Sequence, residues 1–67
     1  MGRLLLKNDN GQFLKSIDTV NQKAIFTKDK YDARSYDGEW FAETELEFVK
    51  FHFKKQEQVE SLHMVYE

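Results

Sequence analysis

The amino-acid sequence predicts an α+β domain in which an antiparallel sheet of three to four strands packs against one principal α-helix. Short apolar segments lie on both sides of a turn motif, NDNG at residues 8–11, and predict an N-terminal β-hairpin. One long segment, residues 39–54, has apolar residues that recur at helical spacing. A chain of 67 residues with no proline and no linker has room for a single domain, 1–67.

The composition narrows the classes of function. A chain that is 40% hydrophobic and 33% charged has the balance of a globular protein, not of a disordered one. Its net charge of −2 gives no overall attraction for nucleic acid or an anionic membrane. The apolar run at residues 4–6 is too short for a signal peptide or a membrane span. The charge and the lack of a span predict no membrane partner, and the absence of cysteine predicts a protein of the reducing cytoplasm.

The first predicted element is a β-hairpin formed by residues 3–7 and 12–18. Asn and Asp open type I turns well, and Gly11 can adopt the positive φ that closes such a turn. With a three-residue loop, Lys7 would face Phe13 across the two strands, whereas another loop length would shift this register.

Two further strands and a short helix follow from local patterns. Residues 23–27, KAIFT, are β-branched and aromatic enough for a third strand. Residues 58–67 alternate weakly between apolar and polar side chains, which indicates a last strand. Residues 27–36 begin with Thr27, a suitable N-cap, and place Asp29 in the first turn, so we expect a short helix there.

Residues 39–54 form the predicted principal helix. Their first apolar stripe, at i, i+4, i+7 and i+11, consists of Ala42, Leu46, Val49 and Phe53. A charged stripe runs from acidic to basic, the order that the helix dipole prefers, and Asp37 could cap the start. The alternative is a strand over residues 44–54, which alternate almost regularly but would need a bulge. We favour the helix because strands of this length are unusual and a sheet does not explain the charge order.

A helix over residues 39–54 would carry a second apolar arc, formed by Trp40, Phe41, Phe48 and Phe51. The two arcs together are wider than one small sheet can cover. In one interpretation, the short helix and the last strand cover the second arc. In the other, the arc is an interface with a protein partner, including a second copy in a homo-oligomer, because aromatic residues anchor protein contacts.

No residues in the sequence point to a catalytic, cofactor or metal site. His52 and His63 have neither metal-ligand spacing nor a third ligand nearby, and no serine occurs in a nucleophile-elbow motif. Glu43 and Glu47 would share one solvated helix stripe, so their pKa values have little reason to separate as acid and base. We therefore expect a protein that is not an enzyme and needs no cofactor.

Nucleic acid is the alternative partner. Residues 50–55, KFHFKK, interleave aromatic and basic side chains. If this segment were a strand, Phe51 and Phe53 could stack on bases. The side chains that would then contact phosphates are Lys50, Lys54 and Lys55. In a helix, the same residues would be divided between core and solvent.

The segment KAIFTKDKYDARSYDGEWFAETELEF resembles an element of small phage- and prophage-encoded proteins of unknown function. The shared features are a strand ending in Thr27, the A-x-x-aromatic spacing of Ala33 and Tyr36, and a helix that opens with Ala42. The resemblance spans about residues 3–67 and implies an α+β fold and a mobile-element origin, without any catalytic or binding residue. We therefore expect a cytoplasmic, non-enzymatic protein-interaction module, a phage accessory factor that acts on a host or phage protein.

Overall fold

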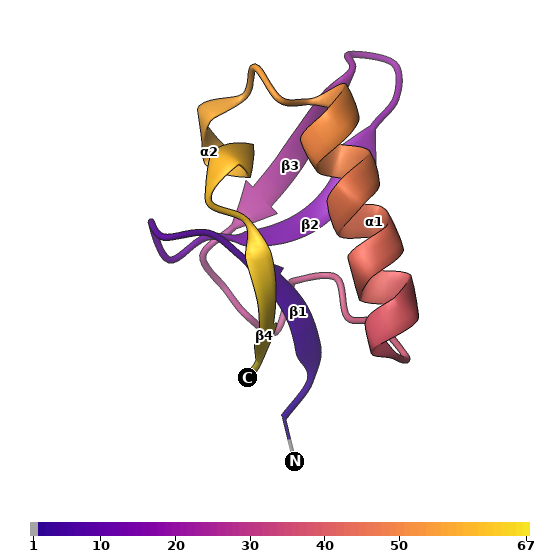
Figure 1. The fold of residues 1–67 in the computed structure, drawn as a ribbon. Helices are drawn as coiled ribbons and strands as arrows, with labels where there is room; N and C mark the ends of the chain where they lie inside the picture. The colour runs from indigo at the N-terminus through magenta and orange to yellow at the C-terminus, as the bar shows by residue number, and fades with distance from the viewer. Residues whose placement is uncertain (1) are drawn as a thin grey trace.

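The computed structural model describes residues 2–67, and its four strands form one antiparallel sheet in the order β3-β2-β1-β4. The elements are β1 Leu4–Lys7, β2 Phe13–Asp18, β3 Lys23–Thr27, α1 Glu39–His52, α2 Glu57–Glu60 and β4 His63–Tyr66. The long helix α1 lies along one side of the sheet, where it packs against β1 and β4 (Figure 1). Arg3 and Glu67 exchange backbone hydrogen bonds, so the two ends of the described chain lie side by side. The predicted α+β fold class, with one principal helix, is confirmed.

The N-terminal hairpin has the predicted turn and register. Lys7 pairs with Phe13, as the three-residue loop requires. Gly11 has a φ of +76° and donates its N–H to the Asn8 carbonyl at 3.3 Å. The Asn8 N–H donates to the Gln12 carbonyl at 2.9 Å and completes the turn.

Gly11→Val should lower the free energy of unfolding by about 1–2 kcal/mol, because a β-branched residue resists positive φ. No atom lies within 4 Å of a Cβ built at Gly11, so the loss would come from the backbone and not from a clash. Urea unfolding measures it, with Gly11→Asn as the matched control because Asn tolerates this conformation. Equal stability of the Val and Asn variants would contradict the role of the positive φ.

A bulge in β2 decides which side chains reach the core. The pairing of β2 with β3 shifts by one residue between Leu14 and Ser16. The extra residue is Lys15, and beyond it Ile17 packs against the same hydrophobic cluster as Leu14. In a regular strand, residues three apart would point to opposite faces of the sheet. The sequence pattern did not predict this bulge.

Hydrophobic side chains are buried on both faces of the sheet. The cluster beneath α1 consists of Leu4, Leu6, Leu14, Ala24, Ala42, Val49, Val59 and Leu62. A smaller cluster on the opposite face consists of Leu5, Phe13 and Ala33. The segment between β3 and α1 supplies Ala33 and is held in place by Arg3, whose guanidinium donates to the carbonyls of Lys30 and Ala33.

The predicted short helix at residues 27–36 is wrong, because this segment forms consecutive turns. The Thr27 hydroxyl accepts the Asp29 N–H at 3.1 Å, and the Asp29 carboxylate accepts the Tyr31 N–H at 2.9 Å. Side chains of this kind stabilise turns as well as helix starts. The segment must also cross the small cluster, and Arg3 binds carbonyl groups that a helix would use internally.

The last predicted strand is only partly correct. Residues 58–67 contain the strand β4, which pairs antiparallel with β1, but α2 occupies their beginning. Val59 and Leu62 are both buried in the cluster beneath α1. Two residues three apart cannot lie on one face of a strand, whereas a helical turn brings them together.

The helix α1 is the predicted principal helix, and the alternative strand over residues 44–54 is therefore wrong. Ala42 and Val49 are fully buried, and Leu46 and Phe53 pack at the edge of the same cluster, so the first apolar stripe faces the core as predicted. The N-cap is Gly38 and no side chain caps the helix, so Asp37 does not have the predicted capping role.

Candidate protein-interaction surface

Four aromatic side chains project from α1 on the side away from its buried stripe. The exposed fractions are 70% for Trp40, 56% for Phe41, 45% for Phe48 and 73% for Phe51. At 100° per residue these four side chains cover an arc of about 100°. We call this arc the aromatic face. It corresponds to the second apolar arc predicted from the sequence, and the interpretation that other elements bury it is wrong.

The aromatic face is exposed because the fold has only one layer of helix on this side of the sheet. The short helix that was expected to cover it does not form, and β4 lies beside β1 within the sheet. The buried stripe of α1 contains Ala42 and Val49, whose small side chains let the helix approach the sheet closely. A second arc on the same helix would need another layer for its burial.

The aromatic side chains also contact one another. The rings of Trp40 and Phe41 meet edge to face with centroids 5.1 Å apart. The ring of His52 lies between two others, 4.3 Å from Phe48 and 5.0 Å from Phe51. Contacts of this kind reduce the freedom of each ring before any partner binds, so less conformational entropy is lost on binding.

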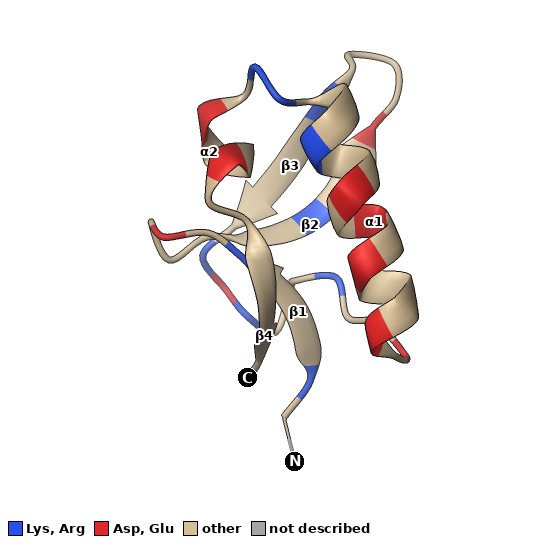
Figure 2. Cartoon of the chain, viewed as in Figure 1, with Lys and Arg blue, Asp and Glu red and all other residues tan. Residues whose placement is uncertain are grey.

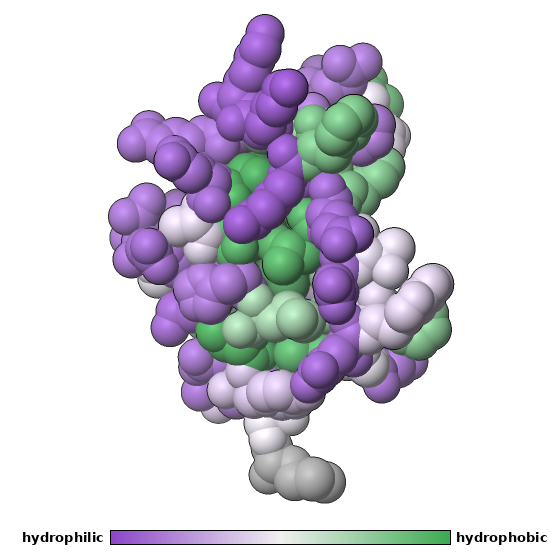
Figure 3. Space-filling view, viewed as in Figure 1, coloured by the Kyte–Doolittle hydropathy of each residue, from purple (hydrophilic) through white to green (hydrophobic). Residues whose placement is uncertain are grey.

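A charged stripe borders the aromatic face along α1. Its side chains are Glu39, Glu43, Glu47 and Lys50, acidic toward the N-terminus and basic at the C-terminus (Figure 2). The hydroxyl of Tyr66 donates to Glu39 Oε2 at 2.7 Å, which joins the start of the stripe to β4. In the space-filling view, hydrophobic and weakly polar side chains over the outer edge of α1 lie beside a column of hydrophilic ones (Figure 3).

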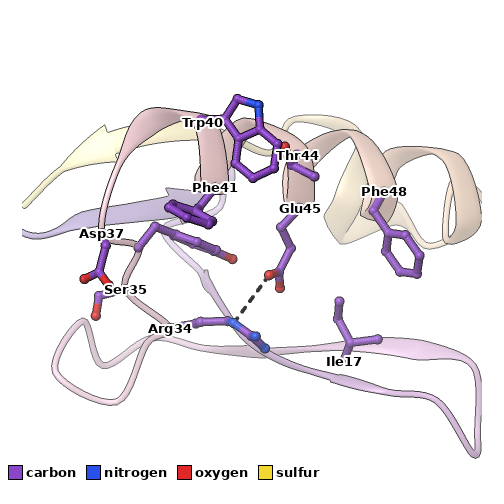
Figure 4. A pocket seen from close by; sticks show the side chains of 10 residues that line it. Ile17, Arg34, Ser35, Asp37, Trp40, Phe41, Thr44, Glu45 and Phe48 are labelled. Carbon is purple, nitrogen blue, oxygen red and sulfur yellow. Dashed lines mark ion pairs between the residues drawn. The ribbon is translucent and has the colours of Figure 1, made fainter.

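A groove of about 460 Å³ separates the aromatic face from β2 and the segment before α1. Phe48 points toward Ile17 across this groove, and Glu45 points toward Arg34, while Trp40 lies on the outer rim (Figure 4). The ion pair between Arg34 Nε and Glu45 Oε2 measures 3.4 Å. It joins α1 to the preceding segment beneath the aromatic face.

Two polar atoms of the groove have no hydrogen-bond partner within residues 2–67, the Tyr36 hydroxyl and Glu45 Oε1. Burial raises the pKa of Tyr36, the adjacent Glu45 carboxylate raises it further, and Arg34 lowers it by less. The hydroxyl therefore lies close enough to that carboxylate to be affected by its charge, although no hydrogen bond joins the two groups.

The sequence does not reveal Arg34, Tyr36 and Ile17 as groove residues, but the helical period indicates Glu45. On a helical wheel Glu45 falls between Phe41 and Val49, so its carboxylate lies at the boundary between the exposed and the buried faces. A half-buried acid in that position requires a partner. No sequence signal identifies that partner as Arg34, because a turn segment supplies it.

The residues predicted for nucleic-acid contact do not lie together on a strand, so that arrangement is wrong. Lys50 and Phe51 belong to α1, whereas Phe53 follows it and packs against the core. Lys54 and Lys55 are exposed in the connection to α2. Phe51 is exposed and Phe53 is half-buried, so the two rings are not available as a shared stacking platform.

The part of the chain that the structure describes has no group of three or more His, Asp or Glu side chains that could hold a metal ion. Between residues 2 and 67, no helix is both long and apolar enough to cross a membrane. Comparisons with models of known protein families, with curated proteins and with solved structures found no match to this chain.

Proposed function

We propose that this chain is a non-enzymatic protein-interaction module and that its contact surface is the aromatic face of α1. The observation that carries this proposal is the exposure of Trp40, Phe41, Phe48 and Phe51 on one helix. Single exposed apolar side chains are ordinary, but contiguous apolar patches bordered by polar residues mark binding surfaces. Aromatic side chains are also enriched where proteins contact one another, and acidic side chains border this patch.

The polar groups of the groove do not favour an enzyme. A general acid or base works best when its pKa lies near the operating pH. The Glu45 carboxylate is held in an ion pair with Arg34. The raised pKa of Tyr36 keeps its hydroxyl protonated far above neutral pH. The Tyr36 hydroxyl is therefore not suited to transfer a proton near pH 7.

The proposed setting is the reducing cytoplasm, in agreement with the absence of cysteine. If the resemblance to small phage-encoded proteins reflects common descent, the module would act as an accessory factor on a phage or host protein. Its small net negative charge agrees better with a protein partner than with nucleic acid.

Photocrosslinking in cells should identify contacts of the aromatic face. Replacing Phe51 by p-benzoylphenylalanine should give adducts that form only under ultraviolet light, because this ring is 73% exposed on that face. The same replacement of Tyr31 is the matched control, since Tyr31 is 79% exposed but belongs to the segment between β3 and α1. Gel electrophoresis and mass spectrometry of the adducts identify the partner.

A protein adduct at position 51 that is absent at position 31 would support the proposal. Equal labelling at both positions, or none at position 51, would contradict it. An adduct at position 51 that disappears after nuclease treatment would favour the nucleic-acid alternative.

A further inference from the structure

We infer that the aromatic face binds a second copy of the chain, with the two α1 helices packed antiparallel about a two-fold axis near residue 46. This pairing presupposes the protein contact proposed above and names its partner. The exposed residues Trp40, Thr44, Phe48 and Phe51 lie at i, i+4, i+8 and i+11, a narrow seam along α1. Rows of side chains four and three residues apart are the ridges along which helices pack, and this 4-4-3 spacing is that of an 11-residue repeat.

The seam is complementary to itself in the reversed direction. An antiparallel second copy would place its Phe51 opposite Trp40 and its Phe48 opposite Thr44, and the two-fold axis would repeat both contacts. The small Thr44 side chain leaves room for the larger Phe48 ring. A parallel pair would instead oppose Phe48 to Phe48 and leave Thr44 facing Thr44.

The charged stripe beside the seam favours the same direction. It is acidic at Glu39, Glu43 and Glu47, and basic at Lys50, with Lys54 just beyond the helix. In the antiparallel pair, Glu43 lies beside Lys50 of the second copy and Glu39 beside its Lys54. These four attractive contacts outnumber the one like-charge contact, between the two copies of Glu47 near the axis, whereas parallel helices place each stripe against the opposite flank of the partner. The ion pairs of residues 2–67 include neither Glu43 nor Lys50, so both charges are available to a second copy.

The available area fits a weak dimer. From the typical size of aromatic side chains, the exposed parts of the four rings amount to roughly 500 Å² per copy. A standard interface buries about 800 Å² per partner, so Thr44 and the stems of the flanking charged residues would supply the remainder. Interfaces of this size range from micromolar to picomolar, and we expect a dissociation constant on the order of 10 μM, near the weak end, because part of this one consists of flexible charged stems.

Analytical ultracentrifugation of the whole chain, from about 1 to 500 μM, tests the association. The wild type should shift from monomer to dimer over this range, and Phe48→Glu should remain a monomer with an unchanged circular dichroism spectrum, because it places a charge in the seam. Phe51→Glu is a second variant at a more exposed position, in case the first one unfolds. A wild type that is monomeric at 500 μM, or folded variants that dimerise like the wild type, would overturn the inference.

Charge reversal tests the direction of the helices. At low salt, Glu43→Lys and Lys50→Glu should each weaken the dimer roughly 5- to 30-fold, since each creates two repulsive contacts across the axis. The double variant should return to within about threefold of the wild type. Glu60→Lys, on the exposed part of α2, makes the same charge change and should leave the affinity unaltered. Single reversals without effect would indicate a parallel pair and overturn the antiparallel arrangement.

Crosslinking gives an independent measure of the same geometry, because the chain has no cysteine of its own. In the antiparallel pair, the two copies of residue 47 lie next to the axis, whereas those of residue 39 are about 20 Å apart along it. Glu47→Cys should therefore be linked by a short bis-maleimide and Glu39→Cys should not. Linking of both variants would indicate parallel helices. A monomeric wild type would exclude the homodimer, while photocrosslinking at position 51 would still decide whether another protein binds.

Discussion

Leu14→Ala should lower the free energy of unfolding by about 3–5 kcal/mol, which is most of the stability expected of a domain this small. Leu14 is fully buried, pairs with Phe26 of β3 and belongs to the cluster beneath α1. Its removal would leave a cavity within the sheet. There β3 on one side, and the Arg34 N–H that donates to the Leu14 carbonyl at 3.0 Å, hold the backbone and prevent collapse. A substantial unfolded fraction should be visible by circular dichroism at 25 °C.

Val20→Ala is the matched control for this truncation. Val20 is 88% exposed in the turn between β2 and β3, so its loss should change stability by less than about 0.5 kcal/mol. Leu46→Ala should have an intermediate cost of about 1–2 kcal/mol, because Leu46 is only half-buried at the edge of the cluster. A cost of less than about 1 kcal/mol for Leu14→Ala in urea unfolding would show that the cluster beneath α1 does not hold the fold together.

Asn8→Ala should cost about 2–4 kcal/mol, an effect unusual for a turn residue. The Asn8 side chain is 1% exposed, and all of its hydrogen-bonding groups are used. Its Nδ2 donates to Gln12 Oε1 and to the Gln58 carbonyl, both at 3.1 Å, while its Oδ1 accepts the N–H groups of Asn10 and Gln12 at 3.0 Å. Alanine would remove these four bonds at once and leave buried groups unpaired.

The same residue connects the hairpin turn to α2, because the carbonyl that it binds belongs to Gln58. Hydrogen exchange of Asn8→Ala should therefore show faster exchange in α2 as well as in the turn. Asn10→Ala, in the same turn but exposed, is the control and should change stability by less than about 0.5 kcal/mol. A similar small change for Asn8→Ala would show that solvent replaces these bonds at little cost.

Local signals in the sequence account for most of the secondary structure. Gly11 and the turn residues before it determine the hairpin and its register, because only a few backbone conformations close so short a loop. The strand at residues 23–27 has the predicted bounds. The repeat of Ala42, Leu46, Val49 and Phe53 matches the helical period, and therefore predicts both α1 and its buried side.

The elements that were predicted wrongly depend on contacts between distant residues. Residues 28–35 form turns beneath the sheet, where Arg3 binds two of their carbonyl groups. The bulge at Lys15 is visible only in the pairing with β3. The beginning of the last predicted strand is helical, and there Val59 and Leu62 fill the space beside α1. No local pattern contains these partners, so propensity alone favours the wrong element.

For the candidate surface, the sequence by itself determined which residues share an arc of α1, because a helix of known period assigns every side chain a direction. Only the tertiary structure decided that Trp40, Phe41, Phe48 and Phe51 remain exposed, since exposure depends on which other elements reach the helix. The groove beneath them also required the fold, which brings Arg34 to Glu45 from a segment without regular structure. Periodicity acts within one element, whereas burial depends on the packing of all of them.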